Sequence, residues 1–262
     1  MTLSNDAGTT LYIKRQRRLP RLLDAFATSL QRALPQTCAL CAAAAGDALV
    51  CAGCAGDLPR LPAACPICAL PSAPATACGA CLKRALPFAT TIAPFAYAFP
   101  IDRLVQALKY RAQLALGGWL ADALVDAVVA RGGPRPDVVV ALPLARSRQR
   151  QRGFNQAAEI TRHVARRLAL PIGTGLARPG DGPPQAALPW AQRMRNVRHA
   201  FACDTSFAGR SVALVDDVMT TGATLDSAAS ALRRMGATRV DAWIVARTLP
   251  PGQSFPSRAP IP

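Results

Sequence analysis

Two acidic residues followed by hydroxyl side chains and a glycine form the segment of this sequence with the clearest chemical use. Asp216-Asp217 comes directly after the apolar run 212–215, and Thr220-Thr221-Gly222 and Thr224 follow. Hydroxyls, and the close backbone approach that glycine permits, suit a phosphate group where a helix begins. Two adjacent carboxylates repel phosphate, but they accept hydrogen bonds from the hydroxyls of a ribose. The segment predicts a site for a phosphorylated sugar; the alternative is a chance strand, turn and helix with an acidic cap.

Eight of the nine cysteines form a second chemical group, because they fall into four C-x-x-C pairs. The pairs are Cys38/Cys41, Cys51/Cys54, Cys65/Cys68 and Cys78/Cys81. Two such pairs supply four thiolates in a tetrahedron, the geometry of a structural zinc site. We expect two zinc ions, each held by consecutive pairs, with interleaved pairing as the alternative. A disulfide framework needs an oxidising compartment, and an iron–sulfur cluster usually needs other spacings. Cys203 stands alone and is interpreted as an ordinary thiol.

Apolar strands alternate with amphipathic helices through residues 87–250, and this alternation predicts a parallel sheet with helices on both faces. Strands are expected at 91–97, 138–142, 212–215 and 240–247, and helices near 101–110, 117–130, 156–168 and 224–235. Open sheets of this class bind ligands beyond the carboxyl ends of their strands. The acid pair at the end of the strand 212–215 therefore lies at the expected edge.

Composition divides the chain into four predicted regions. Residues 1–36 form a basic arm whose apolar residues recur at helical spacing over about 20–34, which indicates a helix packing on its own protein, with binding to a membrane or a partner as the alternative. Residues 37–86 hold the cysteine pairs and are too few to fold without metal. Residues 87–250 form the α/β domain, and residues 251–262, rich in proline and serine, are expected to be a flexible tail.

The formal net charge of +16 comes from 31 basic and 15 acidic residues, and nearly all the basic ones are arginine. A GC-rich genome explains such a bias without any function. The functional interpretation is a surface that attracts nucleotides or nucleic acid. No apolar run reaches the roughly 18–20 residues of a membrane span, and the basic N-terminus lacks the apolar core of a secretion signal. We therefore expect a cytoplasmic protein.

The chain also resembles a known family, the competence protein F family of double-zinc-ribbon, type I phosphoribosyltransferase-like proteins. The resemblance covers roughly residues 21–250 and includes the C-x-x-C pairs. Its other parts, in chain order, are Leu108-Lys109-Tyr110, Pro143-Leu144, 150–156, Gln185, 192–197, Ala200-Phe201 and the acid-pair loop. It implies a type I phosphoribosyltransferase-like parallel sheet flanked by helices, preceded by a double zinc ribbon.

The resemblance further implies a ligand, 5-phosphoribosyl 1-pyrophosphate (PRPP), bound with magnesium. The strand 138–142 becomes the first core strand, and the arginine-crowded segment after it a loop for the pyrophosphate. Guanidinium groups suit a diphosphate because they make bidentate contacts. Of these candidates Arg152 and Asn155 rank first. The residues implied to bind PRPP are Asp216, Asp217, Thr220, Thr221, Gly222, Thr224, Arg146, Arg150, Arg152, Asn155 and Lys109.

A mobile loop is implied at 178–198, between the two ligand loops. Closing it would exclude water from a reactive intermediate. Arg193 and Arg195 are candidates to cover the departing pyrophosphate, and with Asp216 and Asp217 they form the implied catalytic set. The alternative is a surface excursion that carries solvated charge.

The implied function is transfer of ribose 5-phosphate to an unknown acceptor, linked by the family name to DNA uptake. The segment 88–129, the implied hood over the site, contains Lys109, Tyr110 and Arg111 but no recognisable pocket for a base. Two alternatives follow: a PRPP or nucleotide sensor without turnover, and a protein that handles single-stranded DNA through its arginines. His163 and His199 are interpreted as structural or exposed.

Overall fold

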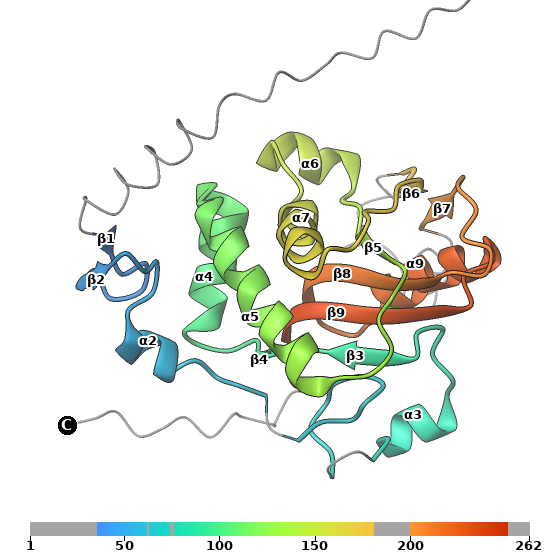
Figure 1. The fold of residues 1–262 in the computed structure, drawn as a ribbon, viewed down its shortest axis with the longest axis horizontal. Coiled ribbons are helices and arrows are strands. Elements are labelled where there is room, and N and C mark those ends of the chain that lie inside the picture. The colour runs from blue at the N-terminus through green and yellow to red at the C-terminus, as the bar shows by residue number, and fades with distance from the viewer. Residues whose placement is uncertain (1–35, 62, 74–75, 181–199, 251–262) are drawn as a thin grey trace, which may run out of the picture.

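A parallel sheet forms the centre of the α/β domain in the computed structural model, which describes residues 36–61, 63–73, 76–180 and 200–250 (Figure 1). The strand order is β3–β9–β8–β5, and β4 also pairs with β9. These strands are β3 (Thr90–Ile92), β4 (Phe95–Ala96), β5 (Val138–Ala141), β8 (Ser211–Met219) and β9 (Arg239–Arg247). Every pairing among them is parallel. The predicted parallel sheet is therefore confirmed.

Helices cover both faces of this sheet, as Figure 1 shows. Val139 and Ala213 pack into one apolar cluster with α4 (Ile101–Arg111), α5 (Ala115–Arg131) and α7 (Gln156–Leu168). Their strand neighbours Val140 and Leu214 pack into the other cluster, with α9 (Ala223–Arg234). Successive strand residues point to opposite faces, so a strand buried on both faces is apolar throughout. This explains the unbroken apolar runs in the sequence.

The central strand β8 is longer than its apolar run, and this corrects one prediction. The acid pair lies inside the strand, because β8 runs on to Met219. β9 supplies the partners: Asp216 is in register with Ile244, and Met219 with Arg247. On the other side, β5 stops opposite Val215. The expectation that the strand ends at Val215 was wrong because a neighbouring strand, not the apolar pattern, determines where β8 ends.

Two further elements differ from the prediction. The strand expected at 91–97 is split into β3 and β4, with Pro94 between them; proline has no N–H to give to a sheet. The arginine-rich segment expected as a loop is a short helix, α6 (Arg146–Arg152). Gly153 ends α6 in the left-handed conformation, with φ 76°. Asn155 then begins α7 as its N-cap, where its side chain accepts from the N–H of Ala157.

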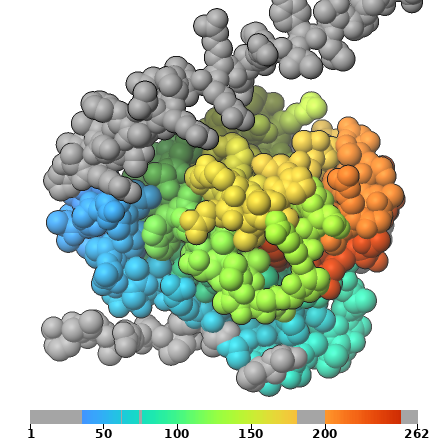
Figure 2. All heavy atoms as spheres, in the orientation of Figure 1, coloured from blue at the N-terminus to red at the C-terminus, as the bar shows by residue number. Residues whose placement is uncertain are grey.

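The cysteine-rich region forms two small units on opposite sides of the sheet. The first contains β1 (Gln36–Thr37), antiparallel to β2 (Ala44–Gly46), and α2 (Ala52–Gly56). The second contains α3 (Gly79–Lys83). Val50 of the first unit belongs to the cluster of α4 and α5, whereas Ile67 of the second packs on the cluster of α9. Figure 2 shows the two units, blue and cyan, along one side and the lower edge of the molecule.

Several predictions fall outside the described residues: the helix at 20–34, the tail and most of the segment 178–198. The two ends of that last segment are close together, because β6 (Leu176–Ala177) pairs antiparallel with β7 (Ala202–Cys203). Within the described ranges, no helix has both the length and the apolar character to cross a bilayer.

Candidate functional site

The acid pair sits at the carboxyl end of β8, where α4 passes over the sheet. Asp217 is buried, and its Oδ2 lies 2.9 Å from Nζ of Lys109 on α4. Both side chains are well shielded, with 4% of Asp217 and 16% of Lys109 exposed. The contact is an ion pair without hydrogen-bond geometry, since Oδ2 accepts no hydrogen bond from the described residues. The structure thus brings Lys109 next to the acid pair, although Lys109 and Asp217 are 108 positions apart in the chain.

The surroundings of Asp216 favour the protonated, neutral form of its carboxyl group. Its side chain is half-buried, and its Oδ1 accepts from the N–H of Asp217 at 2.8 Å. Burial raises the pKa of Asp216 well above its ordinary value, and the negative charge of Asp217 raises it further. The N–H of Asp217 and the charge of Lys109 act in the opposite direction without overcoming these causes. The pair is therefore short of positive charge, and a cation or a hydroxyl donor would relieve it.

We call Asp216 and Asp217 the acid pair and Thr220-Thr221-Gly222 the threonine loop. The threonine loop connects the end of β8, which contains the acid pair, to α9. Thr220 and Thr221 are exposed, and Thr224 is half-buried in the first turn of the helix. Gly222 caps α9 with φ +81°, and a Cβ there would come within 2.5 Å of Cε of Met219. Only glycine adopts this turn without strain. The first turn of a helix leaves N–H groups without intrahelical partners; here the N–H of Ala223 donates to Oγ1 of Thr221 at 3.3 Å.

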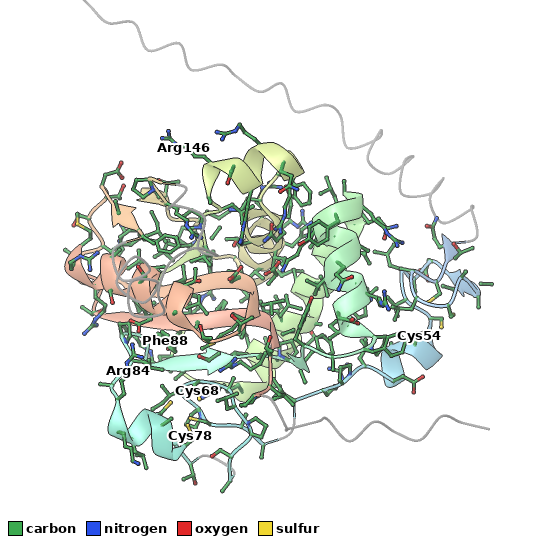
Figure 3. The ribbon with its side chains drawn as sticks, turned by 180° about the vertical axis from the view of Figure 1, so that it is seen from behind. Cys54, Cys68, Cys78, Arg84, Phe88 and Arg146 are labelled. Carbon is green, nitrogen blue, oxygen red and sulfur yellow. The ribbon has the colours of Figure 1, made fainter. Side chains whose placement is uncertain are left out.

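The basic residues after β5 have a different arrangement from the one predicted. Arg146 and Arg150 on α6 are exposed, and Arg146 points away from the body of the molecule in Figure 3. Arg152 is turned inward: its guanidinium lies over the ring of Tyr110 at 5.0 Å and donates to Tyr110 Oη at 3.3 Å. Asn155 donates to the carbonyl of Leu142 at 3.0 Å, which ties α7 to the end of β5.

The end of α4 therefore joins two parts of the site. Lys109 contacts Asp217 on β8, and its neighbour Tyr110 contacts Arg152 on α6. Adjacent positions on a helix point about 100° apart, so one helix end serves both contacts. This gives Leu108-Lys109-Tyr110 a structural meaning: it holds the basic helix α6 beside the acid pair. Arg193 and Arg195 lie outside the described residues.

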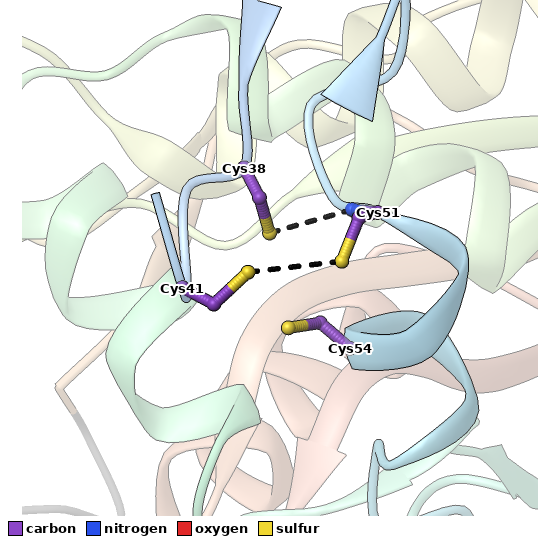
Figure 4. Close-up of side chains that lie close together, drawn as sticks. All are labelled: Cys38, Cys41, Cys51 and Cys54. Carbon is purple, nitrogen blue, oxygen red and sulfur yellow. Dashed lines mark hydrogen bonds between the residues drawn. The ribbon is translucent and has the colours of Figure 1, made fainter. Parts of the chain in front are cut away.

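The eight paired cysteines form two separate four-sulfur clusters, and the predicted consecutive pairing is confirmed. In each cluster the four sulfurs lie within 4.8 Å of one another; the clusters are Cys38, Cys41, Cys51, Cys54 and Cys65, Cys68, Cys78, Cys81. We call them the first knuckle and the second knuckle. Cys41 and Cys51 have sulfurs 3.8 Å apart (Figure 4), and those of Cys68 and Cys78 are 3.6 Å apart. Sulfurs about 2.3 Å from a tetrahedral zinc stand about 3.8 Å from each other.

The chemistry of the sulfurs also fits structural zinc. Burial raises the pKa of Cys38, but backbone N–H donors outweigh it and bring the pKa to about 6. The same balance brings the pKa of Cys65 to about 6. Burial raises the pKa of Cys54 and Cys81, so these thiols need a cation to ionise. Each knuckle thus offers a ready thiolate and further thiols that a metal would deprotonate. Cys203 belongs to neither knuckle; its thiol donates to the carbonyl of Thr205.

Known proteins are similar to this chain in its cysteine-rich region and over a longer stretch of 174–177 residues. A family described as the double zinc ribbon domain matches residues 29–82. The chain is 32% identical over 174 residues to the DNA utilization protein YhgH of Salmonella typhi, covering 64% of this chain and 77% of that protein. It is 32% identical over 177 residues to competence protein F of Haemophilus influenzae, covering 64% and 76%. The chain belongs to the competence protein F family.

Solved structures similar to this competence protein F family member include two whose names refer to phosphoribosyl chemistry. For the glutamine PRPP amidotransferase from B. subtilis, identity is 22% over 49% of this chain and 25% of that one, with a TM-score of 0.35. For the adenine phosphoribosyltransferase from Thermoanaerobacter pseudethanolicus, identity is 16% over 56% and 86%, with a TM-score of 0.34. These values are too low to carry over a ligand or a reaction.

Sequence reasoning missed one residue at the site of this family member, Arg247. It is the last residue of β9 and only 4% exposed, although it carries a charge. Its guanidinium donates to the carbonyls of Cys68, Met219, Thr220 and Thr248. The available signal was a lone arginine that closes an otherwise apolar strand. A buried charge of this kind is rare unless it is hydrogen-bonded on several sides.

Proposed function

We propose that this protein binds PRPP with magnesium at the carboxyl end of β8. One observation supports the proposal most strongly. The shielded acid pair and the threonine hydroxyls at the start of α9 lie within a few residues of each other in one segment. One part suits a ribose and the other a phosphate, in the order that a ribose 5-phosphate requires.

The threonine loop would hold the 5-phosphate. Thr220 and Thr221 are exposed; Oγ1 of Thr221 accepts from the N–H of Ala223 at 3.3 Å and can donate its own proton to a ligand, and Gly222 keeps the backbone close. The N-terminal turn of α9 adds N–H donors and the positive end of the helix dipole. Thr224 contributes a third hydroxyl from within that turn.

The acid pair would hold the ribose hydroxyls and the cation. Mg²⁺ favours oxygen ligands and bridges carboxylate, hydroxyl and phosphate groups. In the absence of ligand, Lys109 supplies the nearest positive charge, at 2.9 Å from Asp217. The raised pKa of Asp216 means that positive charge arriving with the ligand would favour loss of its proton. The pair would then stabilise positive charge that develops on the ribose.

The diphosphate would lie toward the basic residues that follow β5. Arg152 is held at the end of α4 through Tyr110, which places α6 on the same side as Lys109. Arg146 and Arg150 extend the positive charge along α6. Arg193 and Arg195 would approach the departing group from the segment 178–198.

The reaction we propose is transfer of ribose 5-phosphate. The bond between C1 of the ribose and the pyrophosphate oxygen breaks, and the electron pair leaves with pyrophosphate. The acceptor forms the new bond to C1 and gives up a proton to solvent. The two motif residues of α4 already serve other contacts, since Lys109 pairs with Asp217 and Tyr110 with Arg152.

A link to DNA uptake follows from the relatives called competence protein F and DNA utilization protein. One observation favours a second candidate, handling of single-stranded DNA. Arg152, the last residue of α6, lies over the ring of Tyr110, which is 68% exposed, and basic residues next to an exposed ring suit a single strand. A sensor that binds PRPP without turnover is the remaining alternative.

Release of pyrophosphate separates these functions. Zinc-loaded protein is incubated with PRPP and magnesium over a panel of nucleobases and amines, and pyrophosphate is measured. Release that depends on one acceptor class and is lost in Asp216→Asn/Asp217→Asn supports transfer. PRPP binding without any release supports the sensor. Salt-sensitive binding of single-stranded DNA that the two substitutions leave unchanged, without PRPP binding, overturns the proposal.

A further inference from the structure

The second knuckle and the threonine loop are far apart in sequence and are joined by one side chain, Arg247. On the knuckle side, its Nε donates to the carbonyl of Cys68 at 2.8 Å. On the loop side, its Nη1 donates to the carbonyl of Met219 at 2.9 Å and to that of Thr220. Cys68 is a sulfur ligand of the second knuckle, and Thr220 begins the proposed phosphate loop. A single guanidinium therefore spans from a metal ligand to the ligand-binding loop.

The rest of the space between these two parts is largely a cavity. Its volume is about 710 Å³, and both the knuckle and the loop line it. The walls include Leu70 and Phe88 on the knuckle side and Met219, Gly222 and Ser227 on the loop side. Figure 3 shows Phe88 and Arg84 in this region, next to Cys68 and Cys78. Arg84 makes the other link, an ion pair with Asp226, but 56% of its side chain is exposed. Such exposed pairs hold weakly, so Arg247 is the principal tie.

Loss of the guanidinium would remove a donor from the carbonyls of buried Cys68 and Met219 and of exposed Thr220. The carbonyl of Met219 also accepts from the N–H of Thr248 at 3.0 Å, so that part of the sheet would persist. The carbonyls of Thr220 and Cys68 would lose a charge-assisted hydrogen bond, which is stronger than a neutral one. The loop would lose its fixed orientation, while β8 and β9 stay paired.

The second knuckle can hold the other end of this tie only when its own backbone is fixed. Its short helix and turns contain little core, and four-cysteine units of this size are ordered by their metal. Because the sulfur of Cys68 is one of the ligands, zinc would fix the residue whose carbonyl receives Arg247. Within the described residues the first knuckle has no such hydrogen bond to the threonine loop, and its buried residues pack against α4 and α5.

We propose that Arg247 is a positioning residue for the threonine loop, and that zinc in the second knuckle sets the affinity of that loop for a phosphorylated ligand. The affinity part rests on the proposed function. The ordering of the loop does not, because it is a property of the ligand-free protein. The two can therefore fail separately.

Hydrogen exchange of the ligand-free protein tests the tie. Peptides spanning residues 216–226 are followed in wild type, Arg247→Lys, Arg247→Met and the control Arg131→Met. Arg131 also joins the second knuckle to the core, through the carbonyls of Thr91 and Pro66, but not to the loop. We expect exchange about tenfold faster in Arg247→Met, a smaller rise in Arg247→Lys, and wild-type exchange in Arg131→Met; loss of about 1.4 kcal/mol is tenfold. Unchanged exchange in Arg247→Met, or an equal rise in Arg131→Met, overturns the tie.

The zinc part is tested with a matched pair of cysteine substitutions. Cys51 and Cys78 occupy the same place in the two knuckles, as N-caps of α2 and α3. Cys78→Ser is expected to speed exchange of 216–226 as Arg247→Met does, and Cys51→Ser to leave it unchanged. If both variants behave alike, zinc does not act through Arg247. Should Cys78→Ser fail to fold, a chelator titration of wild type decides: loop exchange must rise with loss of zinc in wild type and be already fast in Arg247→Met.

Binding of PRPP with magnesium completes the test. Where wild type binds, Arg247→Met is expected to bind about tenfold more weakly and Arg131→Met as wild type does, with zinc content unchanged in both. Equal affinities in all three overturn the positioning role. If wild type does not bind PRPP, the proposed function fails, while the exchange data still decide whether the tie exists.

Discussion

The two knuckles repeat one geometry in detail. Cys51 and Cys78 each begin a five-residue helix from an extended backbone, with φ, ψ of −65°, 158° and −70°, 158°. The N–H of Cys51 donates to the sulfur of Cys38 at 3.4 Å, and that of Cys78 to the sulfur of Cys65 at 3.3 Å. In each, the residue after the second cysteine takes positive φ, 60° at Ala42 and 56° at Ala69.

Their attachments to the α/β domain differ. The first knuckle is joined by apolar packing, with Val50 and the following Leu58 buried against the cluster of α4 and α5. The second packs on the other cluster through the half-buried Ile67 and adds hydrogen bonds to its backbone: Thr91 Oγ1 donates to the carbonyl of Ile67 at 2.6 Å, and Arg247 to that of Cys68 at 2.8 Å.

Two units with the same four-sulfur geometry are therefore attached to the domain in different ways. Apolar packing supports the helices of one face, including α4, which carries Lys109 to the acid pair. Directed hydrogen bonds instead fix the position of a particular loop, because they depend on angle as well as distance. The acid pair is contacted by Lys109 of α4, the helix on which the first knuckle packs. The threonine loop is contacted by Arg247, which also bonds to the second knuckle.

The largest expected effect is that of removing zinc, which should act on both knuckles in the same way. We expect two zinc ions per chain, and chelation should unfold the region 37–86 and strongly lower the melting temperature. Structural zinc contributes about 10–16 kcal/mol in small zinc-binding peptides. Metal analysis and thermal unfolding with and without chelator measure this. Bound iron, fewer than two zinc ions, or a melting temperature indifferent to chelation would contradict the shared geometry.

The next effect separates the two attachments through their apolar contacts. Leu58 is 5% exposed, so Leu58→Ala should cost about 2–4 kcal/mol of unfolding free energy. Ile67 of the second knuckle is half-buried against the cluster of α9, and Ile67→Ala should cost about 1 kcal/mol. Denaturant unfolding of both variants measures the difference. Equal costs would mean that the second knuckle also depends on apolar packing.

A smaller effect, of opposite sign, is expected at the acid pair between the two attachments. The pKa of Asp216 is raised in the folded protein, so the ligand-free protein should lose stability as pH rises from the ordinary value of 3.8 through the raised one. Asp216→Asn removes this loss and should stabilise the ligand-free protein at neutral pH, which raises its melting temperature. Melting temperatures of wild type and Asp216→Asn, measured over a range of pH, test this. If Asp216→Asn is less stable than wild type near neutral pH, the charge of Asp216 is not disfavoured by its burial and by Asp217.

The smallest effect concerns the exposed link of the second knuckle to α9. Arg84→Met breaks the ion pair with Asp226 and should change the unfolding free energy by at most about 0.5 kcal/mol, because the arginine side chain is 56% exposed. Unfolding in low and high salt checks this. A cost above about 1 kcal/mol would mean that Arg84 shares the role we assign to Arg247.

Local patterns predicted much of this structure. The helix α7 begins and ends at the predicted residues, 156 and 168, because Asn155 caps it and its apolar face is regular. The knuckles followed from spacing alone, since each involves residues within 17 positions. The acid pair was predicted as a ligand site from its own sequence, and this stays a prediction.

The remaining features depend on contacts that no local pattern contains. The extension of β8 to Met219 needs β9 beside it. The contact of Lys109 with Asp217 depends on how α4 crosses the sheet. The bond from Arg247 to Cys68 joins residues 179 positions apart. The helix α6 was missed because arginine and glutamine are compatible with both a basic loop and a helix.

The most direct test of the central claim, recognition of a phosphorylated ribose at the end of β8, is calorimetry of zinc-loaded protein with PRPP. We predict saturable binding that requires magnesium and disappears in Asp216→Asn/Asp217→Asn, while that variant keeps two zinc ions and a cooperative melt. No detectable heat from wild type across several temperatures, or equal binding by the variant, would contradict the account.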